Sequence, residues 1–233
     1  MNWQEIKISK DNNYFVYNGN KLFDRSFQNV LKFHHPGIAP VVDETGAFHI
    51  DSKGKDLYDN RYDRTFGFYC NRAAVIDDGN WFHVDEKGKR VYENYFLWTG
   101  NYQEDICTVR DINNAYFHID KNGNRIYKNN YLYAGDYKNS IACVKLHNGF
   151  FKHIDQKGKF INEESFHDLG VFHKNFALAK DWRGWFHIDK KGNEIYKQRY
   201  SLIEPFYNGF ALVTNPGDIK KIINEKGEEI LTL

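Results

Sequence analysis

Five histidines each stand two residues before an aspartate, and this pairing is the feature of the sequence most able to do chemistry. A carboxylate beside an imidazole can orient the ring for work as a general base. Imidazoles could instead share a zinc ion, but only if two of them came to within about 4 Å of each other. The pairs are His49–Asp51, His83–Asp85, His118–Asp120, His153–Asp155 and His187–Asp189.

The five pairs lie in copies of one longer sequence motif, and the copies follow one another at an even spacing. "NWFHVDEKGKRVYENYF", "AYFHIDKNGNRIYKNNY" and "GWFHIDKKGNEIYKQRY" are three of them. Each histidine precedes a glycine by five residues, and successive glycines are 34 or 35 residues apart. This period predicts one domain of seven tandem repeats over residues 1–233. The repeats are centred on Gly19, Gly54, Gly88, Gly123, Gly158, Gly192 and Gly227.

One copy, taken from residue 141 to residue 172, predicts short antiparallel strands. "IACVKL" alternates with a period of two, "HNG" is typical of a hairpin turn, and "FFKHID" returns as a second strand. "DQKG" predicts a tight turn, because Asp accepts from its own backbone and Gly adopts positive φ. "KFIN" is expected to form a third strand, and "FHDLGVF" a fourth that leads into the next repeat. No helical stripe is visible, so we expect an all-β fold.

Repeated antiparallel meanders either close radially into a propeller or stack into an open β-solenoid. The first and last copies have Tyr14 and Ile222 in place of the histidine, and degenerate ends suit an open array. A count of seven suits a closed ring. We therefore favour a closed, propeller-like arrangement by a small margin over the solenoid.

The composition argues against several classes of protein. Lys plus Arg number 32 and Asp plus Glu number 31, so the net charge of +1 gives no basis for binding nucleic acid or an anionic membrane. No run of about 18 apolar residues and no signal peptide is visible. Cys70, Cys107 and Cys143 have no metal-ligand spacing, so a reduced, cytoplasmic protein without metal or cofactor is expected.

The copy "FALAKDWRGWFHIDKKGNEIY" resembles the tandem WG (or KWG) repeats of bacterial proteins. Ala177, Trp185, Ile188, Asp189 and Gly192 stand where that pattern has its small residue, tryptophan, Ile-Asp and glycine. The resemblance implies a binding or scaffold module. The glycine that names the family is replaced, so the chain looks like a divergent, histidine-bearing variant. The replacing residues are Phe48, Phe82, Phe117, Lys152 and Phe186, and only Trp81 and Trp185 supply the tryptophan.

The strand alternation places each histidine with an aromatic residue and its aspartate on one face, opposite an apolar face. In the structural interpretation, Asp caps the turn, and His bonds to that Asp or to a carbonyl of the next repeat. A residue repeated five times favours this interpretation, because a catalytic site is normally built once. In the binding interpretation, the mixed face contacts a peptide or a sugar. Its candidate ligand-binding residues are His49, Trp81, His83, Tyr116, His118, His153, Trp185 and His187; no catalytic residue is assigned.

The leading hypothesis for function is a non-catalytic binding or scaffold module that presents its repeat surface to a protein partner. The alternatives are a carbohydrate-binding module and an enzyme with a central pocket lined by the His and Asp array. Catalysis would require one repeat to differ from the others, and the repeat around Gly158 comes nearest to that. It has Lys152 and Asn162 where other repeats have Phe and Tyr. The partner's identity and the oligomeric state stay open.

Overall fold

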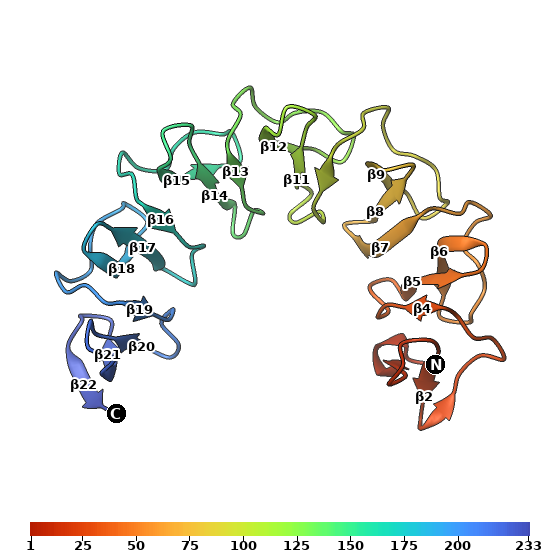
Figure 1. The fold of residues 1–233 in the computed structure, drawn as a ribbon, viewed down its shortest axis with the longest axis horizontal. Coiled ribbons are helices and arrows are strands. Elements are labelled where there is room, and N and C mark those ends of the chain that lie inside the picture. The colour runs from red at the N-terminus through yellow and green to blue at the C-terminus, as the bar shows by residue number, and fades with distance from the viewer. The chain divides into compact units, whose positions relative to one another are not determined.

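A computed structural model describes residues 1–233, and its regular structure is almost entirely β. The exception is one turn of 3-10 helix, η1 (Trp3–Glu5). The strands form seven separate antiparallel sheets that follow one another along the chain (Figure 1). The predicted all-β fold of seven β-meander repeats is thereby confirmed. The chain forms no helix with the length and hydropathy that crossing a bilayer requires.

The chain divides into two compact parts, and the N-terminal part, Met1–Arg125, holds four three-stranded sheets. The first sheet contains β1 (Lys7–Ile8), β2 (Phe15–Tyr17) and β3 (Asn20–Lys21). The second contains β4 (Asn29–Val30), β5 (Ile38–Asp43) and β6 (Gly46–Asp51). The third contains β7 (Arg64–Tyr69), β8 (Arg72–Asp77) and β9 (Asn80–Val84). The fourth contains β10 (Trp98–Thr99), β11 (Cys107–Arg110) and β12 (Tyr116–Ile119).

The C-terminal part, Ile126–Leu233, holds the other three sheets. Two have three strands: β13 (Tyr133–Ala134), β14 (Ile141–Lys145) and β15 (Phe151–Asp155), then β16 (Asp168–Leu169), β17 (Ala177–Asp181) and β18 (Gly184–Ile188). The last has four: β19 (Leu202–Ile203), β20 (Phe210–Thr214), β21 (Lys220–Asn224) and β22 (Glu229–Thr232). That all seven repeats form a single domain, and that it closes into a ring, both stay predictions.

Each histidine-bearing strand ends in a turn built from the Asp and Gly of the repeat. In the turn after β9, Asp85 Oδ1 accepts from the backbone N–H groups of Lys87 and Lys89, both at 2.9 Å. The N–H of Gly88 donates to the Asp85 carbonyl at 2.9 Å, and Gly88 has a φ of +70°. Such a φ favours glycine because it has no Cβ. The predicted cap and glycine turn are therefore present.

The expected third strand at "KFIN" is wrong. The chain after Gly158 makes only an isolated bridge between Ile154 and Phe160, and the N–H of Ile161 then donates to the backbone carbonyl of His153 at 3.1 Å. The turn redirects the backbone after one bridge, so the ladder cannot continue. The segment "FHDLGVF" does contain β16, which pairs with β17 and therefore belongs to the following sheet.

Consecutive repeats pack through a glycine on an aromatic ring. A Cβ added at Gly88 would lie 2.5 Å from the ring of Tyr58, and one added at Gly227 would lie 2.5 Å from Tyr196. In each pair the glycine belongs to one repeat and the tyrosine to the repeat before it. A glycine at this position therefore serves two needs, a positive φ in the turn and close approach to a neighbouring ring.

Candidate functional site

The five histidines of the array lie inside the protein. His49, His83, His118 and His187 have 0% of their surface exposed, and His153 has 2%. Their strands are packed on both faces, since Phe82 and Val84, on the face opposite His83, are also buried. The face expected to be amphipathic therefore carries buried imidazoles.

In four of the five repeats the imidazole Nε2 points at a backbone carbonyl of the next repeat. His83 Nε2 lies 3.1 Å from the oxygen of Gly100, and His187 Nε2 lies 3.0 Å from the oxygen of Glu204. His49 makes the same contact with Phe66 at 2.7 Å. A carbonyl only accepts, so Nε2 carries the proton and donates, and Nδ1 of the neutral ring is left as an acceptor. Each of these three histidines thereby ties its own repeat to the following one.

A tyrosine hydroxyl donates to Nδ1 in three of the repeats. The Tyr92 hydroxyl is 2.5 Å from His83 Nδ1, and the Tyr196 hydroxyl is 2.5 Å from His187 Nδ1. Tyr58 makes the equivalent bond to His49. This tyrosine is the one whose ring packs on the next glycine, and the sequence analysis did not connect it with the histidine. The signal was its constant place, nine residues after the histidine.

Burial makes these imidazoles poor bases. Desolvation lowers the pKa of His49 and of His83 from 6.5 to about 4, although the bond to the carbonyl opposes the shift. The same balance lowers the pKa of His153 and of His187 to about 4. The aspartates are occupied at the turn amides instead, as Asp189 is with Lys191 and Asn193. These four imidazoles are thus buried and neutral at neutral pH, and their aspartates are bonded elsewhere.

The repeat around Gly158 departs from this pattern. Asn162 replaces the tyrosine, and both His153 Nδ1 and Asn162 Nδ2 are buried without a hydrogen-bond partner. Lys152 is buried, with its ammonium 4.6 Å from the centre of the Phe160 ring and 2.8 Å from the Glu163 carbonyl. Lys152 stands where other repeats have a phenylalanine, and Phe160 supplies the ring, so a cation–π contact is kept with its two partners exchanged. This repeat is therefore a variant of the packing found in the others.

The aromatic members of the predicted ligand-binding set are more accessible than the histidines. Trp81, Tyr116 and Trp185 are half-buried. Trp81 stacks on Phe66 with ring centroids 5.2 Å apart, and the Trp185 ring lies 5.5 Å from the Lys180 ammonium. That any of the set contacts a ligand stays a prediction, and the positions of the five histidines favour the structural role.

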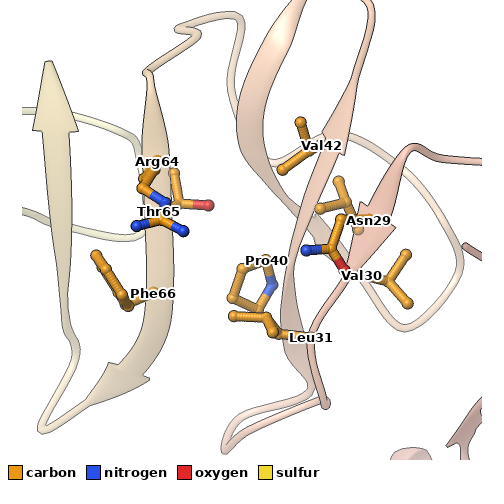
Figure 2. Close-up of a pocket in the computed structure, with 9 residues that line it drawn as sticks. Asn29, Val30, Leu31, Pro40, Val42, Arg64, Thr65 and Phe66 are labelled. Atoms are coloured by element: carbon orange, nitrogen blue, oxygen red, sulfur yellow. The ribbon is translucent and has the colours of Figure 1, made fainter. Parts of the chain in front are cut away.

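A pocket of 220 Å³ lies in the N-terminal part between the sheets β4–β5–β6 and β7–β8–β9 (Figure 2). Its lining comes from β4 and β5 on one side and from the start of β7 on the other. Leu31, Pro40, Val42 and Phe66 contribute apolar groups to its lining, and Asn29 and Arg64 add polar groups. The full lining is Asn29, Val30, Leu31, Pro40, Val41, Val42, Arg64, Thr65 and Phe66.

Two features make this pocket a candidate binding site. Arg64 is exposed and its guanidinium makes no ion pair or hydrogen bond, so its charge is available to a ligand. Val42 pairs with Ala47, which stands where other repeats have an aromatic residue such as Trp81 or Tyr116. A ring at position 47 would lie beside Val42, so its loss leaves room. The pocket was not predicted from the sequence, in which the small Ala47 is the position that sets this repeat apart.

Comparisons with known proteins agree with the repeat and with the fold. The family described as WG containing repeat matches residues 185–215. BamB from Moraxella catarrhalis is similar at a TM-score of 0.53 and 12% identity, over 100% of this chain and 86% of that chain. A eukaryotic initiation factor is similar at a TM-score of 0.60 and 10% identity, over 97% of this chain and 72% of that chain. The computationally designed Ika8 protein is similar at a TM-score of 0.53 and 12% identity, over 98% of this chain and 85% of that chain. No curated protein sequence matches the chain. Likeness at these identities concerns the fold alone.

Proposed function

We propose that this chain, which carries a WG-type repeat at residues 185–215, is a non-catalytic binding module that holds a protein partner on its repeat surface. The observation that carries the proposal is the pocket in Figure 2, where an apolar wall meets the unpaired guanidinium of Arg64. The ligand is a peptide segment with a branched or aromatic side chain next to a carboxylate. The side chain fills the space beside Val42, and the carboxylate pairs with Arg64.

The buried histidines support a binding module over the alternative enzyme. A general base must come within hydrogen-bond reach of its substrate, and the imidazoles already have partners at both nitrogens in three repeats. A substrate in solution would reach them only if neighbouring repeats separated. The carbohydrate alternative keeps the half-buried Trp81 and Trp185 as its stacking surfaces.

Peptide and glycan arrays probed with the purified chain test the proposal. We expect it to select peptides in which an apolar residue adjoins Asp or Glu. Arg64→Glu should weaken the selected peptide at least about tenfold, because a charge pair becomes a repulsion. Lys10→Glu is the matched control, since Lys10 is exposed, unpaired and outside the pocket. Selection of glycans alone would overturn the proposal. So would an equal loss of peptide affinity in Arg64→Glu and Lys10→Glu.

A further inference from the structure

A second cavity lies in the C-terminal part, where the repeat around Gly158 meets the repeat around Gly192. Its volume is 440 Å³. Phe166 and Phe186 form its aromatic wall, with ring centroids 6.1 Å apart and planes at 57°. The carboxylates of Glu164, Asp181 and Glu194 line the same space. Aromatic faces combined with carboxylates suit a flat cation.

The aromatic and acidic residues recur at equivalent repeat positions 138 or 139 residues earlier, in the N-terminal part. There Phe27 corresponds to Phe166 and Phe48 to Phe186, and their centroids are 6.5 Å apart at the same angle of 57°. Asp43 takes the place of Asp181, and Asp56 takes the place of Glu194. The chain therefore builds this aromatic and acidic cradle twice.

In the N-terminal copy the cradle is filled by the chain's own Arg25. Its guanidinium lies 2.9 Å from Asp43 and 2.6 Å from Asp56. The same group lies 4.9 Å from the centre of the Phe27 ring and 5.1 Å from that of Phe48. This copy shows directly which chemical group the cradle accommodates.

In the C-terminal copy the residue that corresponds to Arg25 is Glu164, six residues after its glycine. The cradle therefore lacks its built-in guanidinium and has one more carboxylate, and that of Glu164 makes no hydrogen bond or ion pair. The inner cation is kept in both copies: Arg61 lies 3.7 Å from the Phe48 ring centre, and Arg199 lies 3.7 Å from that of Phe186. The cation at the position of Arg25 is missing, while Arg183 and Lys197 stand at the edge of the cavity where the N-terminal copy has Thr45 and Asp59.

We propose that this cavity binds the guanidinium of an arginine side chain supplied by another molecule, in the place that Arg25 occupies in the N-terminal copy. The guanidinium lies against Phe166 and Phe186 and donates to the carboxylates of Glu164 and Glu194. It meets two competitors, because Arg183 already donates to Asp181 at 2.8 Å and the exposed Lys197 ammonium lies 3.5 Å from Glu194. The residue of the filled cradle that corresponds to Arg183 is Thr45, which carries no charge.

Calorimetric titration of the whole chain with N-acetyl-arginine amide at low ionic strength tests the site. We expect one bound molecule, and binding at least about tenfold weaker for the isosteric but uncharged citrulline derivative. A short peptide with a central arginine and free arginine are further arms, which tell a protein source of the guanidinium from a free amino acid. The cavity in Figure 2 is in the other part of the chain, so Arg64→Glu should leave this titration unchanged.

Further variants place residues of the filled N-terminal cradle at the equivalent positions of the C-terminal one. Glu164→Arg installs the internal guanidinium and should abolish binding while the thermal melt stays cooperative. Arg183→Thr removes one of the two competitors and should tighten binding several-fold. Arg25→Glu empties the N-terminal cradle and should raise the stoichiometry to two; if it unfolds, Arg183→Thr and Glu164→Arg still decide. Absence of binding to the native chain at millimolar ligand, or unchanged binding by folded Glu164→Arg, would overturn the proposal.

Discussion

Acidification should unfold this protein at a pH where most carboxylates are still ionised, because of its buried histidines. The imidazoles of His49, His83, His153 and His187 have a pKa of about 4 in the folded chain, against 6.5 for the free side chain. Between these two values the unfolded state binds more protons than the folded state. The free energy of unfolding therefore falls as the pH falls from 6.5 towards 4.

The size of the loss follows from the two pKa values. At about pH 5 each of these histidines costs about 2 kcal/mol of stability relative to neutral pH. If the four act independently, the total is about 8 kcal/mol, which is within the range of a whole domain's stability of about 5–15 kcal/mol. The carboxylates of Asp43 and Asp181 contribute only at lower pH. Burial opposes their ionisation, but hydrogen bonds from Thr45 and Arg25, and from Arg183 and Arg199, hold their pKa below its usual value.

Urea unfolding followed by tryptophan fluorescence at about pH 7 and about pH 5 measures the difference. His187→Gln removes one of the titrating groups and should shrink the difference by about 2 kcal/mol. A native chain that loses less than about 1 kcal/mol between the two pH values would refute the reasoning. So would imidazole resonances that titrate at the ordinary pKa of 6.5 in the folded protein.

Two further predictions concern the contacts between repeats. Asn162→Tyr should raise the free energy of unfolding by about 1 kcal/mol, because a hydroxyl would donate to the unpartnered His153 Nδ1; a lower melting temperature would contradict this. Gly88→Ala and Gly79→Ala both place a Cβ at a φ near +70°, but only the first meets a ring, that of Tyr58, while Gly79 has open space. Both should lose about 1–2 kcal/mol for the backbone conformation, and Gly88→Ala should lose clearly more; equal losses in chemical denaturation would show that the glycine–ring contact carries no energy.

The sequence predicts the repeats well because their determinants are local. Asp85 and Gly88 define a turn by their own backbone chemistry, and alternation around His83 defines a strand. The spacing of the glycines then fixes the number of sheets. None of these inferences requires knowing which residues from different repeats meet.

What the sequence analysis could not supply is the packing between repeats. The partner of His83 is a carbonyl of Gly100, and any residue type would provide one, so no side chain marks it. The failed strand at "KFIN" has the same origin, since a backbone that bends after one bridge at Phe160 leaves no trace in side-chain alternation. The pocket in Figure 2 adjoins Val42, whose strand partner Ala47 has no ring where other repeats have one, a difference that appears only when the copies are compared position by position.

The glycine that rests on the previous repeat's tyrosine has a consequence for how such a chain can change in length. Four copies of the repeat supply a tyrosine to the junction with the next copy and a glycine to the junction with the copy before, as Tyr92 and Gly88 do within one copy. Among these four copies, removing or duplicating one full period joins a tyrosine to a glycine again. A deletion of any other length leaves one ring without its glycine. Recombination between copies can therefore change the number of repeats by whole units while the junctions between repeats stay intact. A chain of seven tandem repeats can arise in this way.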